Sequence, residues 1–164
     1  MNASSPLIIT DAQLNASFSL IHEASRNDPA PSLALRRQRL DALEALLREN
    51  SPAICAAISA DFGHRSTHET QLLEIFPSLE GIRHVRNHLK SWMKPQRRSV
   101  SLWFQPGHAE IRPQPMGCVG IVTPWNYPLY LAIGPLTAAF AAGNRALIKM
   151  SEFTPSTATL FVEL

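Results

Sequence analysis

The sequence predicts an α/β protein in which helices come first and a β-hairpin and a strand–helix–strand unit follow. Up to Pro95, apolar residues recur every three or four positions, which is typical of amphipathic helices. After Pro95, short runs rich in valine and isoleucine alternate with proline and glycine turns, which indicates strands. Apolar residues make up 45% of the 164 positions and charged residues 17%, so we expect a packed core.

The composition argues against several classes of protein. A net charge of +2 is too small to indicate a nucleic-acid binder by itself. Cys55 and Cys118 do not make a disulfide framework and favour a reducing compartment. The first residues lack the basic segment and long apolar run of a signal peptide, and no apolar stretch reaches the roughly 18 residues of a membrane helix. We therefore expect a cytoplasmic protein without a membrane partner.

The helical part is predicted at residues 33–98, after a segment of uncertain order at residues 1–32. Leucines recur at helical spacing at the start of this part: Leu33, Leu40, Leu43 and Leu47. The arginines between them, Arg36 included, are expected largely on the opposite, solvent-facing side.

Capping residues divide the helical part. Ser51 is the expected N-cap of a second helix, which Gly63 ends with a positive φ. Ser66 and Glu69 have the spacing of a capping box and open a third, long helix. Pro77 lies inside that helix and should kink it or split it in two.

The β part has two pieces. At residues 99–114, strands Val100–Phe104 and Ala109–Arg112 are expected to form a hairpin around the turn at residues 105–107. At residues 115–164, we expect a βαβ unit and the start of a further helix capped by Thr154. The βαβ unit comprises Cys118–Val122, a nearly all-apolar helix Leu129–Ala142, and Ala146–Ile148. Because the sequence stops inside the last helix, we interpret the fold as truncated.

Polar residues follow both parallel strands, at Thr123–Asn126 and at Lys149–Glu152. Ligands of open α/β sheets bind at the carboxyl ends of the strands, so both loops should face one crevice. Asn126 could donate to a developing oxyanion or cap the next helix. Lys149 and Glu152 could hold ribose hydroxyls or be a solvated pair. No Gly-x-Gly-x-x-Gly turn is present, so a dinucleotide would have to be held in another way.

The same residues resemble a known family. Residues 115–128 end in PWNYP, and residues 141–152 read AAGNRALIKMSE. Both segments are similar to aldehyde dehydrogenase motifs, in the same order and at the same separation. Asp61-Phe62-Gly63 and Trp92–Pro95 resemble the branch that contains coniferyl-aldehyde and fatty-aldehyde dehydrogenases. The resemblance covers the chain from about Leu33 onward.

The resemblance implies a role for each residue of the two loops. It makes Asn126 the catalytic oxyanion donor, and it assigns the cofactor to Thr123, Pro124, Trp125, Lys149 and Glu152. The implied cofactor is NAD, with NADP as the alternative, because a ribose-binding glutamate repels a 2′-phosphate. Met150 departs from the family, which usually has proline at this position. No metal is implied.

The resemblance also implies which part of an enzyme this is. Residues 33–98 and 115–164 correspond to a Rossmann-like cofactor domain, and residues 99–114 to a β-hairpin oligomerisation arm. The catalytic cysteine and glutamate are expected beyond position 164, so the chain alone should be inactive, whereas the whole enzyme would oxidise an aldehyde to an acid. Cys118 and Cys55 are not expected to replace the missing nucleophile. The expected partners are a small-molecule aldehyde and a second copy of the chain, bound through the hairpin.

Two other interpretations stay open. One is an interaction module with a basic helix, carried by Arg83, Arg86, Lys90, Lys94, Arg97 and Arg98. Such a run is more often a solvated helix face, so no nucleic-acid partner is predicted. His84 and His88 have metal-ligand spacing but lack the glutamate of a zinc protease, and surface histidines are expected. The other interpretation is a non-catalytic, truncated paralogue.

Overall fold

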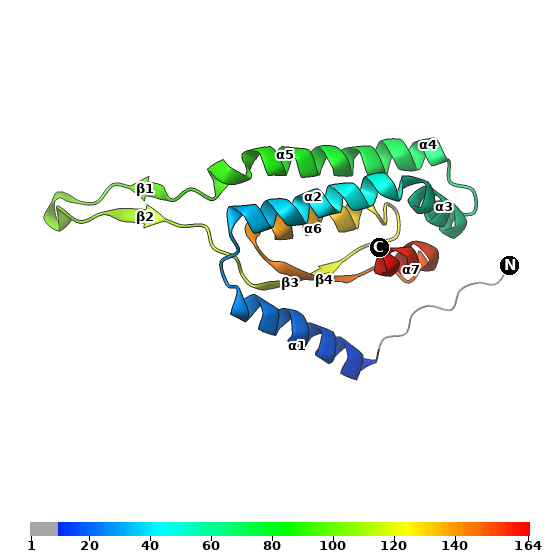
Figure 1. Cartoon of the computed structure of the whole chain (residues 1–164), viewed down its shortest axis with the longest axis horizontal. Helices are drawn as coiled ribbons and strands as arrows, with labels where there is room; N and C mark the ends of the chain where they lie inside the picture. The colour runs from blue at the N-terminus through cyan, green and yellow to red at the C-terminus, as the bar shows by residue number, and fades with distance from the viewer. Residues whose placement is uncertain (1–9) are drawn as a thin grey trace.

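The computed structural model describes residues 10–164, and its parallel strands form a middle layer between helices (Figure 1). The elements are α1 (Asp11–Asn27), α2 (Leu33–Glu49), α3 (Ser51–Phe62), α4 (Thr67–Thr70), η1 (Gln71–Ile75), α5 (Phe76–Trp92), β1 (Gln96–Arg98), η2 (Leu102–Phe104), β2 (Ala109–Ile111), β3 (Cys118–Val122), α6 (Tyr130–Ala142), β4 (Arg145–Lys149) and α7 (Pro155–Glu163). Helix α1 covers one face of β3 and β4, and α6 covers the other, with α2 and α5 packed on α6.

The segment of uncertain order contains helix α1, which the sequence analysis missed. Thr10 opens the helix, and its hydroxyl accepts a hydrogen bond from the Gln13 backbone N–H at 3.3 Å. The Gln13 side chain accepts in return from the Thr10 backbone N–H at 2.9 Å. This reciprocal cap satisfies two N–H groups that the helix itself leaves unpaired. Residues 1–9 lie outside the described part of the chain.

Helix α2 confirms the predicted leucine stripe but corrects the prediction for Arg36. Leu40, Leu43 and Leu47 are buried. Arg36 is also buried: its guanidinium donates to the carbonyls of Pro31 at 2.9 Å and Ala141 at 3.0 Å. Because Ala141 lies at the negative end of the α6 dipole, it is a favourable place for a cation. Burial lowers the pKa of Arg36 below its ordinary value.

Two of the predicted helix caps form differently: Ser51 is not the cap of α3, and Ser66 occupies the cap position of α4 without forming the capping box. Helix α3 begins at Ser51 itself, with Asn50 in the cap position, and Asn50 already closes α2 by donating to Leu46 O at 2.9 Å. Ser66 makes no capping hydrogen bond, and Glu69 lies 3.4 Å from the guanidinium of Arg65 instead. The predicted end of α3 at Gly63, with φ of +59°, is confirmed.

The predicted break at Pro77 takes the form of a π-helical turn. Turn η1 ends at Ile75, directly before α5, and Pro77 occupies the first turn of α5. A proline ring clashes with the carbonyl four residues earlier in a regular helix, and the wider π turn relieves that clash. Glu74 lies in this turn and is fully buried.

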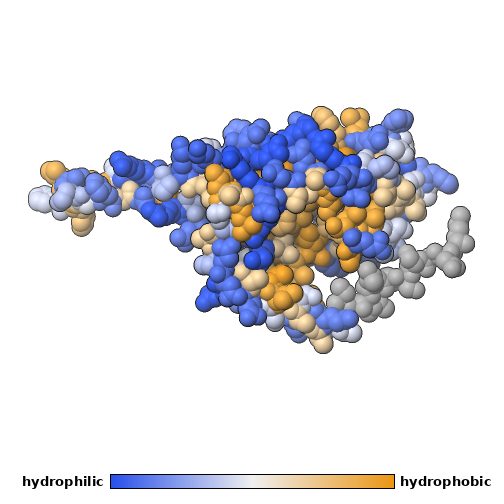
Figure 2. Space-filling view, viewed as in Figure 1, coloured by the Kyte–Doolittle hydropathy of each residue, from blue (hydrophilic) through white to orange (hydrophobic). Residues whose placement is uncertain are grey.

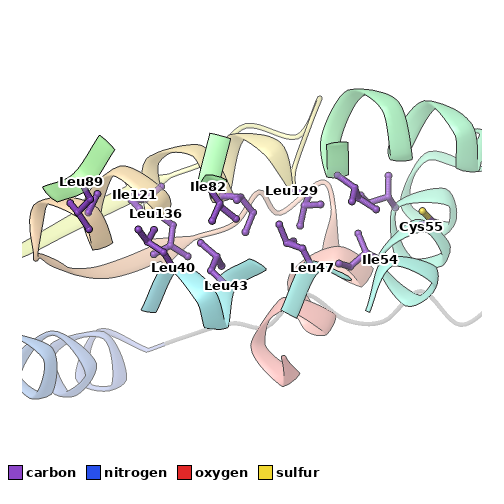
Figure 3. Close-up of a cluster of buried hydrophobic side chains, with 14 residues drawn as sticks. Leu40, Leu43, Leu47, Ile54, Cys55, Ile82, Leu89, Ile121, Leu129 and Leu136 are labelled. Atoms are coloured by element: carbon purple, nitrogen blue, oxygen red, sulfur yellow. The ribbon is translucent and has the colours of Figure 1, made fainter. Parts of the chain in front are cut away.

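The core joins the helical part to the βαβ unit (Figure 3). The leucines of α2 and Ile82 and Leu89 of α5 pack in one cluster with Ile121 and Leu129. Ile121 lies near the end of β3, and Leu129 lies directly before α6. The core therefore fixes both ends of the loop that connects this strand to this helix.

The hairpin is present, but its first strand is earlier than predicted. Strand β1 is Gln96–Arg98 instead of Val100–Phe104, and it pairs antiparallel with β2, with Arg97 opposite Glu110. Residues 102–104 form a 3-10 turn, and Gly107 N donates to Phe104 O at 2.7 Å. These turn bonds occupy backbone groups of residues 101–107 that the predicted strand would have used for pairing. The hairpin projects from the body as an arm (Figure 1).

The surface over α2 and α5 is hydrophilic (Figure 2) because charged side chains of both helices pair there. Arg83 and Arg86 lie 3.2 and 2.9 Å from Glu44, and Arg86 is also 2.9 Å from Asp41. Burial by itself would raise the pKa of Glu44, but hydrogen bonds from its arginine partners outweigh this effect and lower it. The basic run on α5 is thus partly neutralised by α2.

Within residues 10–164, no three metal-ligating side chains cluster together. His88 instead bonds through Nδ1 to His84 O at 2.8 Å, and its ring stacks on Trp92. In the same part of the chain, no helix combines the length and apolar character needed to cross a membrane.

Candidate functional site

The two predicted loops lie at one edge of the parallel strands. Strands β3 and β4 pair in register, with Val122 opposite Lys149, so both end at the same place. Thr123 is buried, and its backbone N–H donates to Lys149 O at 3.0 Å. Its hydroxyl lies 3.4 Å from the same carbonyl and 3.7 Å from the sulfur of Met150. Thr123 therefore joins the two loops, which confirms that they lie together at one edge of the strands.

Asn126 does not cap the next helix, so that alternative is wrong. Helix α6 begins at Tyr130, and the carboxylate of Glu74 accepts from the backbone N–H groups of Leu129 at 2.8 Å and Tyr130 at 3.1 Å. The Asn126 residue is exposed, and its side-chain amide has no hydrogen-bond partner within residues 10–164. The amide is therefore available to a ligand.

Glu74 and Arg65 form a network under this loop that the sequence analysis missed. Arg65 lies 3.1 Å from Glu74 through one guanidinium nitrogen and donates to Asn126 O at 2.9 Å through another. Burial raises the pKa of Glu74, while the N–H groups of Tyr130 and Leu129 and the charge of Arg65 favour its ionised form. The apolar pattern of the helix gave no signal for Glu74, because Glu74 and its buried neighbour one turn later, Ser78, are both polar.

Helix α7 is also capped by a distant carboxylate. Asp61 accepts from the backbone N–H groups of Ser156 and Thr157, both at 2.8 Å, and from the Thr157 hydroxyl at 2.7 Å. The predicted cap, Thr154, makes no side-chain capping bond, and its hydroxyl donates to Ser151 O. A helix N-terminus usually provides free N–H groups for a phosphate. In this protein, carboxylates already accept hydrogen bonds from N–H groups at the N-termini of both α6 and α7.

Lys149 and Glu152 form an exposed pair after β4. The Lys149 ammonium donates to the Glu152 carboxylate, and both side chains are about 60% exposed. This hydrogen bond lowers the pKa of Glu152, which therefore stays ionised at neutral pH. An ionised carboxylate can accept from two hydroxyls at once, and the ammonium has two further donors. The pair is chemically suited to a vicinal diol such as a ribose.

Pro124 and Trp125 cover the outer side of the loop. Both are exposed, and the Trp125 ring lies 6.1 Å from that of Phe62. The six predicted residues thus fall at one edge, with Thr123 buried as a link and the other five at the surface.

The chain belongs to the aldehyde dehydrogenase family, whose sequence profile matches residues 9–164. It is 51% identical to a probable coniferyl aldehyde dehydrogenase of Pseudomonas aeruginosa, over 93% of this chain and 32% of that protein. It is 42% identical to the coniferyl aldehyde dehydrogenase of a Pseudomonas species, over 93% of this chain and 31% of that one. The chain therefore spans about a third of the length of these relatives.

Solved structures show the same fold. AldH of Staphylococcus aureus in a substrate-bound state has a TM-score of 0.86 and 30% identity, over 90% of this chain and 32% of that one. Succinic semialdehyde dehydrogenase of Streptococcus pyogenes in complex with NADP+ has a TM-score of 0.84 and 20% identity, over 99% of this chain and 34% of that one.

Proposed function

We propose that this chain is the N-terminal part of an enzyme that oxidises an aldehyde to a carboxylic acid with a nicotinamide cofactor. The observation that carries the proposal is the free amide of Asn126 at the same strand edge as the Lys149–Glu152 pair. Such an arrangement can hold an aldehyde oxygen and the ribose of a cofactor at the same edge of the sheet. Family membership and the names of the similar proteins support it.

Each exposed residue of the edge has a proposed task. Asn126 donates to the substrate oxygen as negative charge develops on it. Lys149 and Glu152 hold the hydroxyls of the adenosine ribose, and Pro124 and Trp125 line the cofactor. When bound, the nicotinamide accepts the hydride of the aldehyde.

The nucleophile is proposed to come from a part of the complete enzyme outside these 164 residues. Cys55 is buried in the core, and burial raises the pKa of its thiol, which makes it a poor nucleophile. Cys118 is the first residue of β3, at the opposite end of the strand from the loop that carries Asn126. We therefore expect no turnover from this chain alone, and aldehyde-dependent reduction of NAD by the complete protein. An aromatic aldehyde such as coniferyl aldehyde is the proposed substrate, by analogy with the named relatives.

The proposed cofactor is NAD, and Glu152 should set the preference. A carboxylate that binds the 2′-hydroxyl of a ribose repels the phosphate that NADP carries there. We expect Glu152→Gln to weaken NAD binding and to shift the ratio of the NADP and NAD dissociation constants about tenfold toward NADP, or about 1.4 kcal/mol. Titration calorimetry of the complete protein measures both constants. Glu80→Gln is a matched control, because Glu80 is also exposed and pairs with an arginine three residues away. If the ratio of the two dissociation constants did not change, Glu152 would not contact the cofactor ribose.

We further propose that the hairpin arm binds a second copy of the protein. Its tip exposes three large apolar side chains, Leu102, Trp103 and Phe104, each 72–88% exposed. Apolar side chains gathered at the end of an arm are typical of an interaction site. Changing Trp103 to serine should weaken self-association about tenfold or more in sedimentation equilibrium, because aromatic anchors dominate such interfaces. Met116→Ser removes an equally exposed apolar side chain away from the tip and should have no effect. Equal effects of the two changes would contradict the proposal.

A further inference from the structure

We propose that Arg65 is a positioning residue that sets the location of Asn126, and that Glu74 holds Arg65 for this task. The inference rests on the proposed function, in which Asn126 donates to the substrate oxygen. It starts from the loop between β3 and α6, which is anchored at both ends but exposed in the middle. Thr123 and Leu129 are buried at its ends, whereas Trp125 and Asn126 are exposed.

Arg65 supplies the contact that holds the middle of this loop. Its Nη2 donates to the backbone carbonyl of Asn126 at 2.9 Å. Its guanidinium also lies 5.0 Å from the ring centre of Tyr127, the next residue. Both contacts act on the backbone and neighbour of Asn126 and leave the Asn126 amide free for a ligand. Arg65 therefore lies behind the proposed donor and does not reach the substrate itself.

The guanidinium is itself held on several sides. It lies over the ring of Phe62, 4.0 Å from its centre, and it contacts Glu69 at 3.4 Å and Glu74 at 3.1 Å. The Arg65 side chain is only 10% exposed. A planar guanidinium has five N–H donors in a fixed arrangement, so one group can bridge a carboxylate and a carbonyl. A lysine ammonium is a compact point charge and would not reproduce this bridge.

Glu74 connects this arginine to the start of α6. One carboxylate oxygen contacts Arg65, and the other accepts from the N–H groups of Leu129 and Tyr130. The Glu74 side chain has no exposed surface, so its charge requires these partners. A single carboxylate thus fixes the helix that follows the loop and the arginine that holds the loop carbonyl. The position of Asn126 is therefore set relative to both α6 and Arg65.

Such placement matters because oxyanion stabilisation depends on distance. A donor must lie 2.7–3.1 Å from the developing charge to be effective. A shift of about 1 Å in a positioned group can cost about a hundredfold in rate. Loss of the Arg65 contact should therefore slow the reaction with little effect on the binding of the cofactor, whose proposed ribose contacts, Lys149 and Glu152, lie on the other loop.

The test uses the complete enzyme with Arg65→Met and Arg65→Lys. We expect kcat to fall about tenfold to a hundredfold in both variants, with the NAD dissociation constant within about twofold of the original. Arg86→Met is the matched control, because Arg86 also bridges two helices through carboxylates but lies on the ion-paired surface of α5. Its kcat should not change. In the protein without cofactor, deuterium uptake of the segment 125–131 should rise in the Arg65 variants and not in the control.

A double-mutant cycle separates positioning from a general structural role. If Arg65 acts through Asn126, adding Arg65→Met to Asn126→Ala should slow the enzyme less than about twofold further. Full additivity of the two effects would overturn the inference, as would normal kcat in both Arg65 variants. If Arg65→Met does not fold, the same double-mutant cycle is measured with Arg65→Lys and Asn126→Ala, and its result decides. A normal rate in Asn126→Ala would overturn the proposed function itself, so the two failures are distinguishable.

Discussion

Replacing Asn126 with alanine is expected to lower kcat of the complete enzyme about 10²–10³-fold, or about 2.7–4 kcal/mol of transition-state stabilisation. The expected loss is large because the amide is exposed and its hydrogen-bonding capacity is not used within the described residues. Glu74 already caps α6, so the change removes no structural contact of the side chain. Stopped-flow and steady-state assays with a fixed aldehyde measure the effect.

The control for this experiment is Asn87→Ala. Asn87 is an exposed asparagine on α5, far along the chain from the loop, and its removal should leave kcat unchanged. Asn126→Ala should also leave the unfolding midpoint and the NAD dissociation constant close to their original values. A kcat within about twofold of the original enzyme would show that Asn126 is not the oxyanion donor.

The βαβ unit could be predicted from the sequence because local and long-range preferences agree there. Cys118–Val122 is an apolar run of strand length, and Leu129–Ala142 is too long and too apolar to be anything but a buried helix. A strand–helix–strand segment of this length is typical of a parallel pair of strands. Their shared direction brings the Asn126 and Lys149 loops together, as the structure confirms. The roles of the individual residues at that edge stay predictions.

The features that could not be predicted depend on partners far away in the sequence. Local patterns correctly placed Ser66 and Thr154 at the cap positions, but neither side chain caps its helix, and the N–H groups of α7 bond to Asp61, which is 95 residues from Ser156. Helix α6 is capped by Glu74, which is 55 residues from Leu129. A capping box describes only contacts within one turn, so it cannot indicate a carboxylate supplied by another helix. The same holds for Arg36, whose carbonyl partner on α6 is 105 residues away.

Gly143→Ala is expected to destabilise the protein by about 2–5 kcal/mol. Gly143 has φ of +87°, a conformation that costs an L-residue about 1–2 kcal/mol. A Cβ at this position would also lie 2.7 Å from the central carbon of the Arg36 guanidinium. Moving that buried guanidinium weakens its hydrogen bonds to Pro31 and Ala141, and bonds to charged groups contribute about 1.5–3 kcal/mol each. Urea unfolding measures the change in the free energy of unfolding.

The same substitution at Gly81 should have the opposite sign. Gly81 is exposed inside helix α5, and an added Cβ would meet no atom within 4 Å. Alanine there should stabilise the protein by about 0.5–1 kcal/mol, since glycine is a poor helix former. If both variants unfolded at the same urea concentration, Arg36 would not be held against Gly143. The destabilisation by Gly143→Ala should also extend to β3. Asn144, the residue after Gly143, accepts from Gly117 N at 2.9 Å and so joins the end of α6 to the start of β3.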